Sequence, residues 1–294
     1  MDRRIGFFGL GKMGLPMARH LATRGHSVIG YDRIDERNSA ARAAGLAVAQ
    51  TAAQLVSGCP VVVSSLPDDA ALEETANVVA AHALPGTVYI DTSTVSIEAS
   101  ARAAASLDDA GVTYLRCTVS GNSHMAQAAQ LTVMASGPRN AFDAASEIFS
   151  CWGSTCFYLG EGEQARLMKL VINLMIMLTS GMLAEALTLG RKGGLAWADM
   201  WQVIESSAVA SPIVKSKAAL LGRRDFSPTF TVQQMRKDVG LILDAGVALN
   251  VPLGLTALAA QWLSSAAAHG GAEDDYAYVI KIVEHAAAMD STVV

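Results

Sequence analysis

The stretch Ile5-Gly6-Phe7-Phe8-Gly9-Leu10-Gly11-Lys12-Met13-Gly14 decides the fold of this chain. Its apolar first half is typical of a buried strand, and Gly9, Gly11 and Gly14 then form the pattern G-x-G-x-x-G. The apolar spacing of residues 15–24 predicts a helix directly after the pattern. A glycine-rich turn between a strand and a helix is the fingerprint of a fold that binds a dinucleotide, because the turn lets backbone N–H groups approach the pyrophosphate.

An acidic residue follows the second predicted strand, residues 28–31. Asp32 lies 18 residues after Gly14 and is placed to accept hydrogen bonds from ribose hydroxyls, which favours NAD. Arg33 follows immediately and could instead pair with the 2′-phosphate of NADP. The sequence therefore predicts a nicotinamide dinucleotide as cofactor, with NAD favoured and NADP left open.

Short β-rich runs alternate with amphipathic helical stretches up to about residue 160, and only helices follow. Such alternation predicts βαβ units and a mostly parallel sheet. We expect an α/β Rossmann-type, doubly wound N-terminal domain (residues 1–160), followed by an all-α C-terminal domain (residues 161–294), joined by a long interdomain helix. The expected strands are 5–8, 28–31, 61–65, 88–90, 112–115, 131–135 and 156–158. The expected later helices are Gln164–Lys192, 198–207, 212–221, 232–249, 254–269 and 274–288.

Composition excludes several classes of protein. The net charge is −5 and no basic stripe exists, so we expect no nucleic-acid partner. The four cysteines form no CxxC pair, which predicts neither a metal site nor disulfides and favours the cytoplasm. No signal peptide is expected before the first strand, and the most membrane-like stretch, residues 170–184, is too short to span a bilayer.

Apolar residues make up 51% of the chain and charged residues only 17%. A surface this poor in charge is typical of a protein that covers part of its area with another subunit. We therefore expect a homodimer or homotetramer that associates through the helical domain.

Lys169 is a single charge inside the long apolar helix, and Asn173 lies one turn later on the same face. A buried lysine loses its charge readily and can exchange a proton near neutral pH. Hydride transfer needs a group that takes a proton from, or returns it to, the oxygen of the C–OH/C=O pair. The pattern predicts this role for Lys169, with Asn173 orienting it or the substrate; a lysine whose amine reaches water from a helix end is the alternative.

Ser120, Gly121 and Asn122 lie in an uncharged stretch. A loop of small polar residues can present N–H and hydroxyl donors to a carboxylate, although an ordinary turn has the same composition. His124 in this loop could contact substrate or be a plain loop histidine. Lys237 precedes Asp238. The sequence alone allows two readings equally: a lysine that reaches a ligand, or a solvated lysine beside Asp238.

The chain resembles the β-hydroxyacid dehydrogenase family in six motifs that recur in order. These are 9–18, Leu66-Pro67, Asp91-Thr92-Ser93-Thr94, Val119-Ser120-Gly121-Asn122, Lys169-Leu170-Val171-Ile172-Asn173 and Lys237-Asp238. Three departures stand out: the family has glycine at Asn122, Gly-Thr at Ala129-Gln130, and asparagine at Ile172. The first two lie in the substrate loop and put the identity of the substrate in doubt more than the chemistry.

The resemblance and the residues together assign roles. We expect Lys169 and Asn173 to be catalytic and a small carboxylate substrate to be bound by Ser120, Gly121 and Asn122. The expected cofactor-binding residues are Gly9, Leu10, Gly11, Lys12, Met13, Gly14, Asp32 and Arg33. The resemblance further implies cofactor contacts at Leu66, Pro67 and Thr94, and a role for Lys237 toward both cofactor and substrate. We expect an NAD(P)-dependent enzyme that interconverts a small 3-hydroxy acid and its semialdehyde or keto form. Two alternatives are an imine reductase or reductive aminase on the same scaffold, which the retention of Lys169 disfavours, and a non-catalytic NAD(P)-binding protein.

Overall fold

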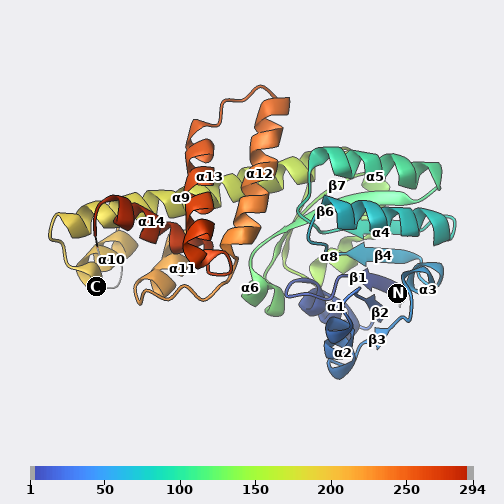
Figure 1. Ribbon diagram of the computed structural model, residues 1–294. Coiled ribbons are helices and arrows are strands. Elements are labelled where there is room, and N and C mark those ends of the chain that lie inside the picture. The colour runs from blue at the N-terminus through green and yellow to red at the C-terminus, as the bar shows by residue number, and fades with distance from the viewer. Residues whose placement is uncertain (1–3, 290–294) are drawn as a thin grey trace. The chain divides into compact units, whose positions relative to one another are not determined.

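The chain divides into two compact units, Met1–Lys169 and Leu170–Val294. The structure, a computed structural model, describes residues 4–289 (Figure 1). The division lies inside helix α9 (Gln164–Lys192) rather than at Gly160, where the strands were predicted to end. The reason is local: the start of α9 is bonded to the sheet, since Thr118 Oγ1 donates to the Ala165 carbonyl at 2.9 Å.

The first unit contains one eight-stranded sheet in the order β3-β2-β1-β4-β5-β6-β7-β8. Every neighbouring pair is parallel except β6 and β7. The strands are β1 (Arg4–Phe8), β2 (Ser27–Tyr31), β3 (Ala47–Val48), β4 (Val61–Ser64), β5 (Val88–Asp91), β6 (Thr113–Ser120), β7 (Thr132–Ser136) and β8 (Thr155–Tyr158). The prediction of a mostly parallel, doubly wound domain is confirmed.

Helices cover both faces of this sheet, which is why its central strands read as continuous apolar runs. Alternate residues of β1 show the division: Ile5 and Phe7 pack in the core with α1 and α8, and Phe8 packs in the core with α3, α4 and α5. The helices of this unit are α1 (Gly14–Thr23), α2 (Asp35–Ala43), α3 (Ala52–Ser57), α4 (Asp69–His82), α5 (Ile97–Asp109), α6 (Ser123–Gln127), α7 (Arg139–Ala144) and α8 (Ser146–Ser150).

Strand β1 lies where the strand order reverses, between β2 and β4. In open α/β sheets, ligands bind at such a switch point, beyond the carboxyl ends of the strands. Here the glycine turn follows β1, Asp32 follows β2, and the loops at Leu66 and Thr92 follow β4 and β5. The topology thus gathers the predicted cofactor residues of the first unit at one edge of the sheet.

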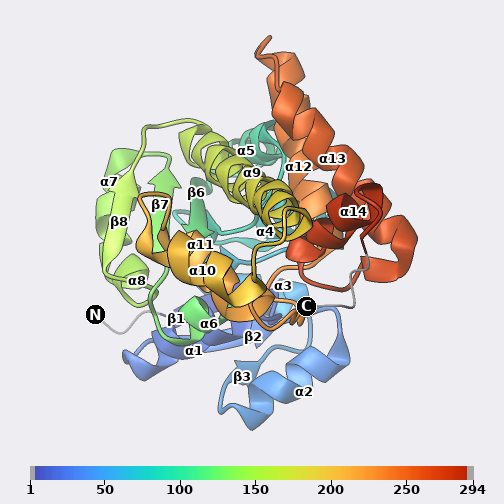
Figure 2. The same cartoon turned by 90° about the vertical axis from the view of Figure 1, so that its left-hand side faces the viewer.

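The second unit is helical, as predicted. After α9 come α10 (Trp197–Ser206), α11 (Pro212–Leu221), α12 (Val232–Ala248), α13 (Gly254–Ala266), a kinked turn (Ala267–Gly271) in which Gly270 has a φ of 85°, a 3-10 turn (Tyr276–Tyr278) and α14 (Val279–Ala286). Helices α12 and α13 lie side by side as a hairpin (Figures 1 and 2). The core of this unit is built from Met177, Leu183 and Leu187 of α9 and from apolar residues of α10 to α14.

Helix α9 is longer than its most apolar part suggests. By length and composition alone, the 29 residues of α9 could cross a membrane. The expectation that this apolar segment is too short to span a bilayer, based on residues 170–184, is therefore wrong for the length of the helix. However, a core helix of a globular unit meets the same criteria, and 44% of the most apolar window of α9 is buried inside the structure. Helix α9 contributes Met177, Leu183 and Leu187 to the core of the second unit.

Candidate functional site

The glycine turn is held by contacts that exclude any side chain at two of its three positions. Gly9 has a φ of +82°, and a Cβ there would lie 2.2 Å from the Ser65 carbonyl oxygen. A Cβ at Gly14 would lie 1.8 Å from the Gly9 carbonyl oxygen. Gly11 differs, because a Cβ there would meet nothing closer than the Arg37 guanidinium at 3.9 Å. The backbone at Gly11 therefore borders open space, as the approach of a pyrophosphate requires.

Helix α1 begins at Gly14, directly behind this turn. Within residues 4–289, no side chain caps its first turn, and no acidic residue lies there. Lys12 is exposed, and Met13 is half-buried at the N-cap position. In the first turn of α1, the Leu15 N–H donates to the Gly11 carbonyl at 3.0 Å, and Pro16 has no N–H. The N-terminus of α1 can therefore favour a phosphate group mainly through its positive partial charge.

Asp32 lies at the end of β2 and is 5% exposed. Its Oδ2 accepts a hydrogen bond of 2.8 Å from the N–H of Leu10, and its Oδ1 accepts one of 2.9 Å from the N–H of Ile34. The Arg37 guanidinium reaches Oδ2 at 3.3 Å, whereas Arg33 is exposed. Asp32 thus holds the glycine turn through the Leu10 N–H, and of the two arginines Arg37 contacts its carboxylate.

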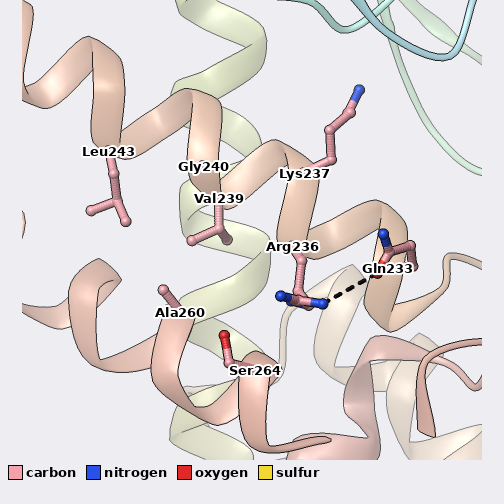
Figure 3. A pocket seen from close by; sticks show the side chains of 8 residues that line it. All are labelled: Gln233, Arg236, Lys237, Val239, Gly240, Leu243, Ala260 and Ser264. Atoms are coloured by element: carbon pink, nitrogen blue, oxygen red, sulfur yellow. Dashed lines mark hydrogen bonds between the residues drawn. The ribbon is translucent and has the colours of Figure 1, made fainter. Parts of the chain in front are cut away.

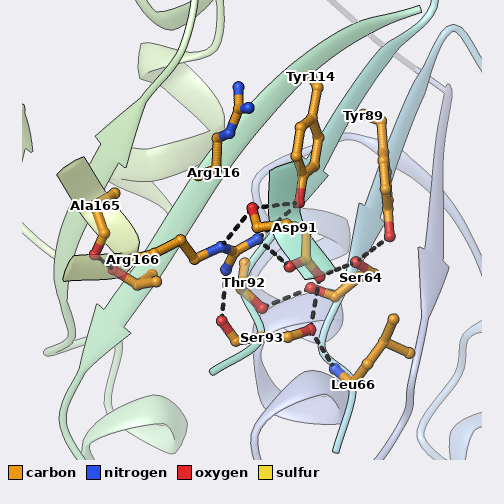
Figure 4. A network of polar contacts seen from close by, with 12 residues as sticks. Ser64, Leu66, Tyr89, Asp91, Thr92, Ser93, Tyr114, Arg116, Ala165 and Arg166 are labelled. Carbon is orange, nitrogen blue, oxygen red and sulfur yellow. Dashed lines mark hydrogen bonds and ion pairs between the residues drawn. The ribbon is translucent and has the colours of Figure 1, made fainter. Parts of the chain in front are cut away.

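The loops after β4 and β5 are joined by a buried network (Figure 4). The N–H of Leu66 donates to Ser93 Oγ at 2.8 Å, and Ser93 Oγ donates to Asp91 Oδ1 at 2.6 Å. Thr92 Oγ1 donates to the Ser64 carbonyl at 2.6 Å. Pro67 and Thr94, the other predicted cofactor residues here, are exposed and half-buried, respectively. The structure therefore places Leu66, Pro67 and Thr94 on adjoining loops.

Arg166, which the sequence did not single out, belongs to this network. It lies in the first turn of α9 and is 1% exposed. Its guanidinium forms a salt bridge with Asp91 and donates to the Ser93 carbonyl at 2.6 Å. The sequence held one signal for it, a charged residue three positions before Lys169 at the start of an apolar helix.

The predicted substrate segment is not a simple loop. Ser120 is the last residue of β6, which is longer than predicted, and Asn122 caps helix α6 by accepting from the Met125 N–H at 3.0 Å. Gly121 has a φ of +137°, and a Cβ there would lie 2.7 Å from Leu131. Asparagine in place of the family's glycine at position 122 is thus explained by helix capping.

Two further residues shape this segment. His20 Nε2 of α1 lies 3.0 Å from the Ala126 carbonyl oxygen, so α6 is tied to the helix that follows the glycine turn. Ala129, where the family carries glycine, adopts a left-handed φ of 53°. His124 is exposed on α6. The short helix, rather than an open loop, therefore borders Ser120 and Gly121.

Lys169 and Asn173 lie one turn apart on α9. Lys169 is half-buried, and Asn173 is 4% exposed. Asn173 Nδ2 donates to Asp238 Oδ2 at 2.6 Å, and Lys237 Nζ lies 3.0 Å from Asp238 Oδ1. The second unit thus brings together Asn173 and Lys237 through the buried carboxylate of Asp238, a residue not named among the predicted site residues.

A groove between α12 and α13 lies beside this cluster (Figure 3). Its volume is about 330 Å³, and it is lined by Gln233, Arg236, Lys237, Val239, Gly240, Leu243, Ala260 and Ser264. Arg236 donates to Gln233 Oε1 at 3.3 Å. The Lys237 side chain points away from Arg236 and Ser264 in Figure 3, so its amine does not belong to the groove's interior.

Two family models match nearly the whole chain. Residues 4–160 match the NAD-binding domain of 6-phosphogluconate dehydrogenase. Residues 163–283 match the NAD-binding domain of NADP-dependent 3-hydroxyisobutyrate dehydrogenase. Both descriptions name a nicotinamide dinucleotide, which fits the glycine turn and the uncapped end of α1.

Three similar proteins illustrate the relationship. The 2-(hydroxymethyl)glutarate dehydrogenase of Eubacterium barkeri is 32% identical over 96% of this chain and 95% of its own length. The human cytokine-like nuclear factor N-PAC is 28% identical over 97% of this chain, and the match covers only 52% of N-PAC. The solved structure of Mycobacterium tuberculosis 3-hydroxyisobutyrate dehydrogenase with L-serine has a TM-score of 0.89 and 29% identity, covering 96% of this chain and 99% of that one.

Proposed function

The chain belongs to the β-hydroxyacid dehydrogenase family and is an NAD(P)-dependent hydroxyacid dehydrogenase, and from this premise we propose its substrate class and the roles of its residues. The substrate is a small 3-hydroxy acid, which is interconverted with its semialdehyde or keto form. The observation that carries the assignment is Lys169, one turn before a buried asparagine on α9, in a chain whose first unit has a complete dinucleotide turn. The first unit holds the cofactor, and the second unit mediates oligomerisation.

The residues of the first unit fit the cofactor at three points. Gly11 borders open space, the N-terminus of α1 has a positive partial charge with no acidic residue in its first turn, and Asp32 lies at the end of β2. When bound, the nicotinamide supplies the acceptor or donor of the hydride. The turn from Gly9 to Gly14, together with Leu66, Pro67 and Thr94, binds and orients the dinucleotide.

Lys169 carries the proton in this proposal. Its Nζ takes the proton from the substrate hydroxyl as the C–O bond gains double-bond character, and returns it in the reverse direction. Asn173 orients the hydroxyl, and its own amide is fixed by Asp238 at 2.6 Å. In the first unit, the N–H groups and hydroxyl at Ser120, Gly121 and Asn122 bind the substrate carboxylate.

A 3-hydroxyacid dehydrogenase, an imine reductase and a non-catalytic NAD(P)-binding protein differ in the substrates that they convert. A panel of 3-hydroxy acids (hydroxyisobutyrate, glycerate, threonate and serine), with γ-hydroxybutyrate for contrast, is assayed with NAD and NADP separately beside a set of cyclic imines. We expect reduction of the cofactor by at least one 3-hydroxy acid. Turnover of imines alone would identify an imine reductase, and cofactor binding with no turnover would identify a binding protein.

The cofactor preference follows from Asp32. We propose NAD, because a 2′-phosphate would face the buried carboxylate, which is 5% exposed. The wild-type enzyme is expected to have a higher kcat/KM with NAD than with NADP, and Asp32→Ser to lower the NAD/NADP ratio by about tenfold, equal to about 1.4 kcal/mol. Asp35→Ser, which changes an exposed aspartate at the start of α2, serves as control. A wild-type preference for NADP would mean that Arg33 and Arg37 determine the choice.

We also propose that the protein is a cytoplasmic homodimer or homotetramer that associates through the second unit. Helix α9 exposes large apolar side chains along this unit: Val171 is 42%, Met175 63% and Leu189 76% exposed. Apolar area of this kind is usually covered by another protein surface. Light scattering at micromolar concentration should give the mass of a dimer or tetramer; a monomer would contradict this expectation.

A further inference from the structure

The Arg166 guanidinium is bonded on every side within the first unit (Figure 4). Besides Asp91 and the Ser93 carbonyl, it donates to Tyr114 Oη at 2.8 Å and to Ser100 Oγ at 3.2 Å. Arg166 and Asp91 side chains are both fully buried. A buried ion pair with this many hydrogen bonds fixes its surroundings in one geometry.

The second oxygen of Asp91 continues the network into the cofactor loops. Asp91 Oδ1 accepts from Ser64 Oγ and, at 2.6 Å, from Ser93 Oγ. Ser93 Oγ in turn accepts from the Leu66 N–H at 2.8 Å. An unbroken chain of hydrogen bonds therefore leads from the first turn of α9 to the loops after β4 and β5.

The two tyrosines beside the Arg166–Asp91 pair carry no charge at neutral pH. Burial raises the pKa of Tyr114, and burial together with the neighbouring Asp91 raises the pKa of Tyr89. Both tyrosines therefore stay protonated at neutral pH. The charge of Arg166 is balanced by Asp91, and the network is neutral overall.

The start of α9 is anchored without Arg166. Ser136 Oγ donates to the Gly162 carbonyl at 2.6 Å, and Arg116 forms a salt bridge of 2.6 Å with Glu163. Thr118 Oγ1 holds the Ala165 carbonyl. A buried ion pair is also weak as a source of stability, because apolar residues of similar volume serve about as well. Anchoring of the helix therefore does not explain the pair.

We propose that Arg166, paired with Asp91, is a positioning residue that fixes the loops carrying Leu66 and Thr94 relative to Lys169. Lys169 follows Arg166 by three positions on α9, so a shift of the loops against this turn changes the distance between cofactor and amine. A displacement of the reacting groups by about 1 Å can lower a rate by about a hundredfold, even when the mutation that causes it lies far from the reacting atoms. The inference rests on the proposed roles of these loops and of Lys169.

Two variants test it. Arg166→Met alone leaves a buried carboxylate unpaired and can unfold the chain, so the main variant is the double change Arg166→Met with Asp91→Asn, which removes both charges. We expect it to fold, to bind NAD about tenfold more weakly, and to lower kcat by more than tenfold. Arg166→Lys should recover part of both losses, because lysine keeps the charge but reaches fewer acceptors.

A second buried pair provides the matched control. Lys217, 3% exposed, bonds Asp275, 1% exposed, at 2.5 Å inside the second unit. The double change Lys217→Met with Asp275→Asn should lower the melting temperature without changing NAD affinity. The proposal is overturned if the Arg166/Asp91 variant keeps wild-type NAD affinity and kcat, or if the control loses NAD affinity equally. NAD affinity is measured by titration without substrate, so this result does not depend on whether Lys169 carries the proton.

Discussion

Replacing Lys169 by alanine is expected to lower kcat by at least about a hundredfold, the usual contribution of a general acid or base. The side chain is half-buried on α9, one turn before Asn173, whose amide is fixed by Asp238. Removing the amine leaves the hydroxyl oxygen without a group to exchange its proton. NAD affinity and the melting temperature should stay near wild type, because the glycine turn and the network of Asp91 are untouched. Steady-state turnover and an NAD titration measure the two quantities separately.

Lys215→Ala is the matched control, since Lys215 is an exposed lysine on α11. It should leave kcat unchanged. If Lys169→Ala retained a kcat within about tenfold of wild type, the assignment of the proton step to Lys169 would be wrong. Loss of NAD affinity in Lys169→Ala would instead indicate that the lysine acts in cofactor binding.

Alanine at two glycines of the turn should affect different properties: Gly14→Ala should lower stability, and Gly11→Ala should lower NAD affinity. In Gly14→Ala the new Cβ would lie 1.8 Å from the Gly9 carbonyl oxygen, so backbone must move. We expect a loss of stability of about 1–3 kcal/mol or more, seen as a lower melting temperature. In Gly11→Ala the Cβ meets only Arg37 at 3.9 Å, so stability is kept. NAD affinity should nevertheless fall by more than tenfold, because the methyl group occupies space that the pyrophosphate needs.

Gly254→Ala, at the start of α13, controls for the substitution itself, since a Cβ there meets nothing within 4 Å. It should change neither property. Wild-type NAD affinity in a folded Gly11→Ala variant would show that the dinucleotide does not approach the turn there. A fully stable Gly14→Ala variant would show that the turn tolerates a wider geometry.

The residues that bind the cofactor at the glycine turn could be predicted from local sequence alone. The glycine turn, the helix behind it and Asp32 lie within one βαβ unit, where spacing along the chain determines spacing in the fold. The limits of α9, Gln164 and Lys192, were also predicted, because its apolar period is unbroken and Gly193 and Gly194 follow it.

Contacts across long separations could not be predicted in this way. Arg166 and Asp91 are 75 residues apart, and Asn173 and Asp238 are 65 apart. No periodicity relates such pairs, and only the folded sheet and helices bring them together. The very short elements β3 and α6 were missed for a different reason: two and five residues are too few to show a period.

Direct hydride transfer from a 3-hydroxy acid to NAD can be followed by isotope labelling. The substrate identified in the panel is prepared with deuterium on the hydroxyl-bearing carbon and incubated with the enzyme and NAD. Mass spectrometry of the recovered cofactor should show one deuterium in the reduced nicotinamide, because the hydride passes directly between the two carbons. Reduced cofactor without deuterium, or product formed without reduction of the cofactor, would show that the enzyme does not transfer a hydride from a 3-hydroxy acid.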